Sequence, residues 1–143
     1  MTITNVVLFI ILMITSIQDL RKKKVSLSLL GVSFISTLVT LGLQEGTLFN
    51  MNHLWGSCIG ICLCLISILT RGAIGWGDGL VFVIIGFGLG FSHTLNILFL
   101  SLFLSALFSI GLVVIKKVSK KTTIPFIPFV FLGFMGVMLL YGI

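Results

Sequence analysis

Gly75-Trp76-Gly77-Asp78-Gly79 places a carboxylate at the start of an apolar run that extends from Leu80 to Phe91 without a charged residue. The whole chain holds only three acidic residues, Asp19, Glu45 and Asp78. Asp19 and Asp78 both lie where an apolar segment meets a polar one. An ionised carboxylate is costly beside hydrocarbon, and acidic residues within membranes usually belong to a transport pathway or a reaction. These two aspartates are therefore the first candidates for a functional site.

The composition predicts a membrane protein. Hydrophobic residues make up 58% of the 143 residues and charged residues 8%, whereas soluble domains carry roughly 25% charged residues. A membrane-spanning helix needs about 20 mostly apolar residues, so a chain of this length can supply about six. We expect an all-α, polytopic integral membrane protein that forms a single domain over residues 1–143.

The apolar runs predict where the helices lie. They cover residues 4–18, 25–43, 54–70, 78–91, 95–115 and, after a start at 125–128, the rest of the chain. Residues 44–53 are predicted to form a loop and residues 92–94 a short turn. The fourth run is too short for a hydrocarbon core of about 30 Å. We therefore expect residues 75–79 to form a non-helical turn in a recessed, wet pocket around Asp78.

The basic residues predict the orientation. All nine Lys and Arg residues fall in the first, third and fifth connections, at Arg21–Lys24, at Arg71 and within 116–121. Because cytoplasmic loops carry the excess of positive charge, both termini are expected outside the cytoplasm. No basic residue precedes the first run, which is unlike a signal peptide. The basic clusters suit anionic lipid headgroups, and no nucleic-acid partner is expected.

The three cysteines, Cys58, Cys62 and Cys64, lie in one apolar run without C-x-x-C spacing. They are expected to be small buried hydrophobic residues, and neither zinc nor a disulfide framework is indicated. The two histidines are expected on the outer side, away from the aspartates. The sequence thus predicts no metal and no cofactor.

The predicted topology brings Asp19 and Asp78 to the cytoplasmic ends of their helices. Carboxylates a few Å apart cannot both be ionised, so such a pair shares one proton. One member can then activate water while the other polarises a carbonyl group. Each aspartate also has a structural interpretation: Asp78 as a helix N-cap, and Asp19 as a surface partner of Arg21 or the lysines.

Three segments resemble known motifs. Gly75-Trp76-Gly77-Asp78 matches the G-x-G-D signature of the polytopic aspartic proteases. Asp19-Leu20-Arg21, followed by a basic run and Val25, resembles the first-aspartate motif of the type IV prepilin peptidases. Pro125-Phe126-Ile127-Pro128-Phe129 resembles the motif before the last helix of that family. The resemblance covers essentially the whole chain.

The chain departs from this family in three places. Lys is common two residues after the second aspartate, where this chain has Leu80, and Asn is usual eight residues after the first, where it has Leu27. Larger members carry a cytoplasmic insertion with paired C-x-x-C motifs, associated with N-methylation of the cleaved pilin. This sequence has no such insertion, so it resembles a short form without the N-methyltransferase domain.

The resemblance implies an aspartic endopeptidase of the bacterial inner or plasma membrane. Members remove the short basic leader of type IV pilin-like precursors at the cytoplasmic membrane face. Asp19 and Asp78 would be catalytic, and the residues that bind substrate or shape the site would be Gly75, Gly77, Gly79, Arg21, Pro125 and Pro128. The glycines would let the substrate backbone approach closely. Two alternatives stay open: a non-catalytic assembly factor of a pilus or competence system, and a small proton-coupled transporter.

Overall fold

The computed structural model describes residues 3–22, 25–45, 51–70, 75–115 and 125–142. Within these ranges there is no strand, so the expected all-α class is confirmed. The described residues form six helices: α1 (Ile3–Lys22), α2 (Leu27–Glu45), α3 (Met51–Leu69), α4 (Trp76–Leu89), α5 (Phe91–Val114) and α6 (Ile127–Tyr141).

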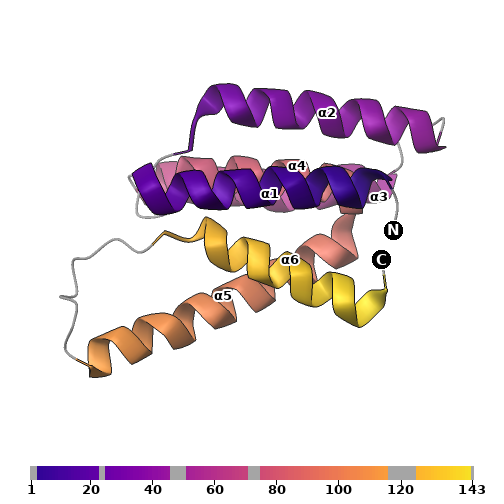
Figure 1. Ribbon diagram of the computed structural model, residues 1–143. Helices are drawn as coiled ribbons and strands as arrows, with labels where there is room; N and C mark the ends of the chain where they lie inside the picture. The colour runs from indigo at the N-terminus through magenta and orange to yellow at the C-terminus, as the bar shows by residue number, and fades with distance from the viewer. Residues whose placement is uncertain (1–2, 23–24, 46–50, 71–74, 116–124, 143) are drawn as a thin grey trace.

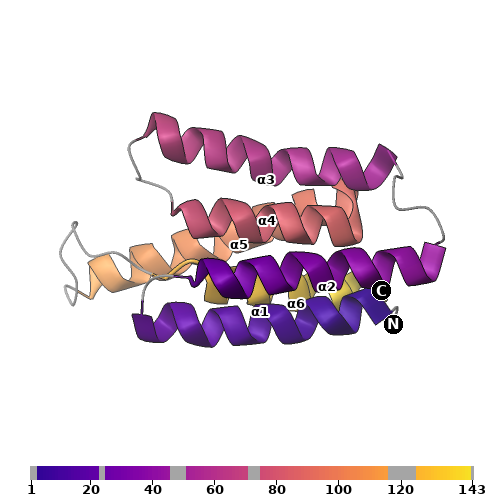
Figure 2. The same ribbon diagram turned by 90° about the horizontal axis from the view of Figure 1, so that it is seen from above.

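Consecutive helices run in alternating directions (Figures 1 and 2). The last turns of α1, α3 and α5 lie at one end of the bundle, together with the first turns of α2, α4 and α6. We call this the aspartate end, because α1 carries Asp19 in its last turn and α4 carries Asp78 in its first. The start of α1 and the end of α6 lie at the opposite end.

Helix α4 is at the centre of the fold and packs against α3, α2, α5 and α1. Its side chains Phe82 and Ile85 are fully buried, and the core continues into Leu8 of α1 and Phe134 of α6. Burial of large apolar side chains around one helix holds the position of that helix. The first turn of α4, which carries Asp78, is therefore held by the core of the molecule.

Glycines bring α3 and α4 into main-chain contact. A Cβ atom on Gly56 would collide with the main chain of Gly86, and one on Gly60 with the main chain of Val83. The G-x-x-x-G spacing places Gly56 and Gly60 on one face of α3, and small residues there let two backbones approach. This face of α3 packs directly on the main chain of α4.

Two predicted connections are wrong. Residues 92–94, expected to form a turn, belong to the first turn of α5, and the chain instead reverses at Gly90 (φ 80°). Glycine adopts this backbone conformation without strain, and the Thr94 hydroxyl donates to the Gly90 carbonyl oxygen at 2.7 Å. The loop expected at 44–53 is also shorter than expected, since α2 extends to Glu45 and α3 begins at Met51; residues 46–50 lie outside the described ranges.

Three helices are long and apolar enough to cross a membrane: α1 over Ile3–Arg21, α3 over Met51–Leu69 and α5 over Phe91–Val114. The other apolar stretches, Leu27–Leu43, Trp76–Leu89 and Ile127–Tyr141, are shorter. With 14 residues, α4 is about 21 Å long at 1.5 Å per residue. The expected shortness of the fourth helix is thus confirmed.

The expected burial of the cysteines is wrong for two of them. Cys58 and Cys62 are exposed on the surface of the molecule, and Cys64 is half-buried. The reason is that the face of α3 with Gly56 and Gly60 packs against α4. The helix is apolar all round, so composition alone does not indicate which face is covered.

Candidate active site

Asp19 lies in the last turn of α1 and is 6% exposed. Its Oδ2 atom accepts a hydrogen bond of 3.2 Å from the main-chain N–H of Ile127, the first residue of α6. Helix α1 ends at Lys22, beyond the predicted end at residue 18, so Asp19 is helical. The first-aspartate segment and the Pro-Phe-Ile-Pro segment, far apart in sequence, therefore meet directly.

Asp78 lies in the first turn of α4 and is half-buried. Its main-chain N–H donates to the Gly75 carbonyl oxygen at 3.1 Å. The Asp19 carboxylate lies close enough to act electrostatically on Asp78. The first and fourth helices thus bring both carboxyl groups to the aspartate end.

The glycines beside Asp78 make close contacts with neighbouring groups. A Cβ atom on Gly75 would lie 2.9 Å from the Asp78 Oδ2 atom, and one on Gly77 would lie 3.1 Å from the Val25 Cγ2 atom. On Gly79 it would lie 2.9 Å from the main-chain nitrogen of Cys64. The absence of side chains lets the first turn of α4 fit between the start of α2 and the middle of α3.

The predicted non-helical turn over 75–79 is wrong, because α4 already begins at Trp76. Gly75 is the N-cap and is extended (φ −63°, ψ 129°), whereas Gly77 and Gly79 are helical. Glycine is unfavourable inside a helix, but here close packing requires it. The glycines reflect contacts between helices instead of a loop.

The chain is similar in sequence to known leader peptidases. The sequence profile described as "Type IV leader peptidase family" matches residues 6–110, which include both aspartates. The chain belongs to this family. It is also 32% identical over 81 residues to "Prepilin leader peptidase/N-methyltransferase" of Bacillus subtilis (strain 168). That match covers 56% of this chain and 33% of the length of the relative.

No solved structure matches the chain. The family predicted from the three motifs is confirmed by the profile match. Residues 125–129 lie beyond the matched range, so the contact between Asp19 and Ile127 connects the matched region to the last helix.

The other predicted site residues also lie at the aspartate end, but they differ in how exposed they are. Arg21 is exposed on the last turn of α1, while Pro125 and Pro128 are half-buried at the start of α6. Of the two departures from the family pattern, Leu80 is half-buried against the core and Leu27 is 73% exposed.

Sequence reasoning missed two contacts that hold the site together. The Gln18 Oε1 atom accepts a hydrogen bond of 3.2 Å from the main-chain N–H of Ser26, which ties the end of α1 to the start of α2. The rings of Phe126 and Phe82 pack with their centroids 6.4 Å apart. Gln18, a polar residue next to Asp19 in an apolar run, was a signal for the hydrogen bond to Ser26. No pattern indicated the packing of Phe126 on Phe82.

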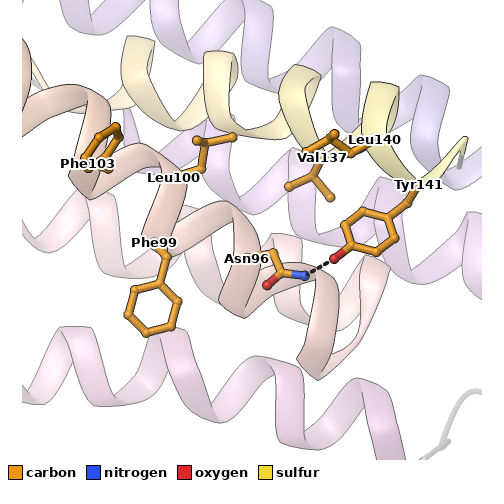
Figure 3. A pocket seen from close by; sticks show the side chains of 7 residues that line it. All are labelled: Asn96, Phe99, Leu100, Phe103, Val137, Leu140 and Tyr141. Carbon is orange, nitrogen blue, oxygen red and sulfur yellow. Dashed lines mark hydrogen bonds between the residues drawn. The ribbon is translucent and has the colours of Figure 1, made fainter.

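A hollow of about 350 Å³ lies between α5 and α6, away from the aspartates. It is lined by Asn96, Phe99, Leu100, Phe103, Val137, Leu140 and Tyr141 (Figure 3). The Asn96 side-chain amide donates to the Tyr141 hydroxyl at 3.0 Å. Tyr141 ends α6 at the far end of the bundle, so this hollow is separate from the candidate active site.

Proposed function

We propose that this chain is a membrane-embedded aspartic endopeptidase that removes the short basic leader from type IV pilin-like precursors. The observation that carries the proposal is that the last turn of α1 and the first turn of α4 place Asp19 and Asp78 at the same end of the bundle. Family membership supports a leader peptidase. A protease of the aspartic type needs two carboxyl groups that share a proton, and these are the only two aspartates in the chain.

In the proposed reaction, a water molecule lies between the two carboxyl groups. The ionised carboxylate takes a proton from the water, and the water oxygen attacks the scissile carbonyl carbon. The protonated carboxyl donates its proton to the carbonyl oxygen, which gives a neutral tetrahedral intermediate. Collapse of the intermediate breaks the C–N bond, and the leaving amine takes up a proton from the pair.

The substrate would reach the pair from the side that the packing leaves open. Gly75 is exposed beside the Asp78 carboxyl group, so a precursor backbone can approach there without meeting a side chain. Gly77, Gly79, Pro125 and Pro128 would shape the site through helix contacts, and exposed Arg21 would lie at its rim.

We propose that all six helices span a bacterial inner or plasma membrane, with the aspartate end facing the cytoplasm and both termini outside. Every basic residue belongs either to the last turn of α1 or to the segments that join α1 to α2, α3 to α4 and α5 to α6, and this distribution supports the orientation. Those residues would also attract anionic lipids. Because α4 is only about 21 Å long, Asp78 would lie in a wet recess below the cytoplasmic surface, within a single peptidase domain over residues 1–143.

The test is cleavage of a purified pilin precursor by the full chain in proteoliposomes. Wild-type protein should release the leader, whereas Asp19→Asn and Asp78→Asn should each reduce cleavage to background, since an amide cannot share the proton. Glu45→Gln is the matched control, because Glu45 ends α2 at the opposite end of the bundle, and it should cleave normally. Wild-type protein without cleavage, or an active Asp19→Asn variant, would refute the proposal.

A further inference from the structure

The N-cap residue of α6 is Phe126. Among the described residues, no side chain of α6 forms a hydrogen bond that caps the start of the helix. Pro128, in the first turn, has no N–H group. The N–H groups of Phe129 and Val130 both donate to the Phe126 carbonyl oxygen, at 2.9 Å and 3.2 Å. The N–H of Ile127 is thus directed to a group outside the helix, and that group is Asp19.

This contact favours the ionised form of Asp19. A carboxylate that accepts main-chain N–H bonds is stabilised as the anion, and the N-terminus of α6 adds the positive end of a helix dipole. The end of α1 alone would disfavour an anion, because a helix C-terminus carries a partial negative charge. The start of α6 supplies the partial positive charge that stabilises the Asp19 carboxylate.

Asp78 lies in the first turn of α4, whose dipole also favours an anion. Within the part of the chain that the structure describes, no side-chain cap hydrogen bond forms at the start of that helix, and the charge of Asp19 opposes a second negative charge nearby. A proton shared between two carboxyl groups resides on the one whose anion is less stabilised. The hydrogen bond from the Ile127 N–H to Asp19 therefore distinguishes the members of the pair.

The same short segment also contacts the helix that carries Asp78. The ring of Phe126 packs against Phe82, which lies one turn after Asp78 in α4 and is fully buried. Residues 126–128 thus bind α1 through a main-chain hydrogen bond and pack on α4 through an aromatic ring. Such a segment sets both the separation of the two helices and the environment of one carboxyl group.

We propose that residues 126–128 act as a positioning segment that holds Asp19 as the ionised member of the pair and leaves the shared proton on Asp78. This deepens the proposed function and rests on it for its catalytic meaning. Asp19 then takes the proton from the attacking water, and Asp78 gives its proton to the carbonyl oxygen of the substrate. Ile127 and Phe126 act through the aspartates and do not touch the substrate.

The sequence makes this proposal directly measurable, because the chain has only two aspartates. Full-length protein with carboxyl-¹³C aspartate, in lipid bilayers, should give two side-chain carboxyl resonances by solid-state NMR. Asp19→Asn and Asp78→Asn assign them. At a pH where the pair holds one proton, Asp19 should resonate as a carboxylate and Asp78 as a carboxylic acid. The reverse assignment, or two equivalent resonances, would overturn the proposal whether or not any variant folds.

Two substitutions at one position test the role of the N–H group. Ile127→Pro removes it and should reduce the difference between the two resonances by more than half, with kcat for precursor cleavage lowered and KM unchanged. Ile127→Val retains the N–H and should keep both the resonances and kcat. An Ile127→Pro variant that folds with wild-type resonances would overturn the proposal. Because the resonances need no substrate, wild-type protein with the expected assignment but no cleavage would refute only the proposed function.

Discussion

Replacing Gly60 with alanine tests whether the contact between α3 and α4 sets the position of Asp78. A Cβ atom on Gly60 would lie 2.6 Å from the carbonyl carbon of Phe82 and 2.7 Å from the Cα atom of Val83. Ordinary contact begins at 3.4 Å. Because the opposing atoms belong to the main chain of α4, they cannot rotate away as a side chain would. The two helices must therefore separate by roughly 1 Å.

The expected magnitude follows from this separation. Overpacking a well-packed core costs about 1–3 kcal/mol, and alanine recovers up to about 1 kcal/mol relative to glycine through helix propensity. Because the collision is with main-chain atoms, we expect a cost at the top of that range, so the Gly60→Ala variant should lose about 2 kcal/mol of stability. Since α4 carries Asp78, its displacement also changes the geometry of the aspartate pair. A misplacement of about 1 Å can cost about 100-fold in rate, so we expect a cleavage rate about 10- to 100-fold lower.

Thermal unfolding in detergent and initial cleavage rate in proteoliposomes measure the two effects separately. Gly111→Ala in α5 is the matched control, because among the described atoms nothing lies within 4 Å of the added Cβ position. The control should cleave like wild type and should be as stable or up to about 1 kcal/mol more stable, because alanine is the better helix former. A Gly60→Ala variant with wild-type stability would refute the packing argument. Reduced stability with an unchanged rate would show that this contact does not position Asp78.

Two further predictions concern orientation and pH. A reporter fused after Ile143 should be active outside the cytoplasm and one inserted within 116–121 active inside; a cytoplasmic C-terminus in this assay would contradict the six-span proposal. Leu80→Lys should fold and move the acid limb of the pH–activity profile to lower pH, because a nearby cation favours loss of the first proton from the aspartate pair. An unchanged acid limb, measured on one precursor, would mean that position 80 does not affect the pair.

Much of the architecture could be predicted from local sequence. A helix in lipid satisfies its own backbone hydrogen bonds, so each long apolar run predicts a helix whatever its neighbours are. The number of helices and the shortness of α4 follow from this. Alternation of direction then brings the end of α1 and the start of α4 to the same end. The proximity of Asp19 and Asp78 could therefore be predicted without knowing any contact.

The contacts that define the candidate site could not be predicted in this way. Helices that are apolar all round carry no periodic signal for the face that packs inward, which is why the exposure of Cys58 and Cys62 was missed. The chain reversal was predicted at residues 92–94 instead of at Gly90, because several residues in the stretch after α4 suit a turn. Gly77 and Gly79 suggested a loop, because glycine is common in loops. Their role in close helix packing becomes visible only when the neighbouring helices are in place.

The sequence by itself determined the class of protein, the family and the two aspartates, because these depend on composition, charge and short motifs. Only the tertiary structure decided which groups each aspartate contacts. The hydrogen bond between Ile127 and Asp19 joins residues 108 positions apart, and it exists because α6 packs against α1. The environment of a carboxyl group is set by the donors that packing brings to it, and no local pattern in either segment specifies that encounter.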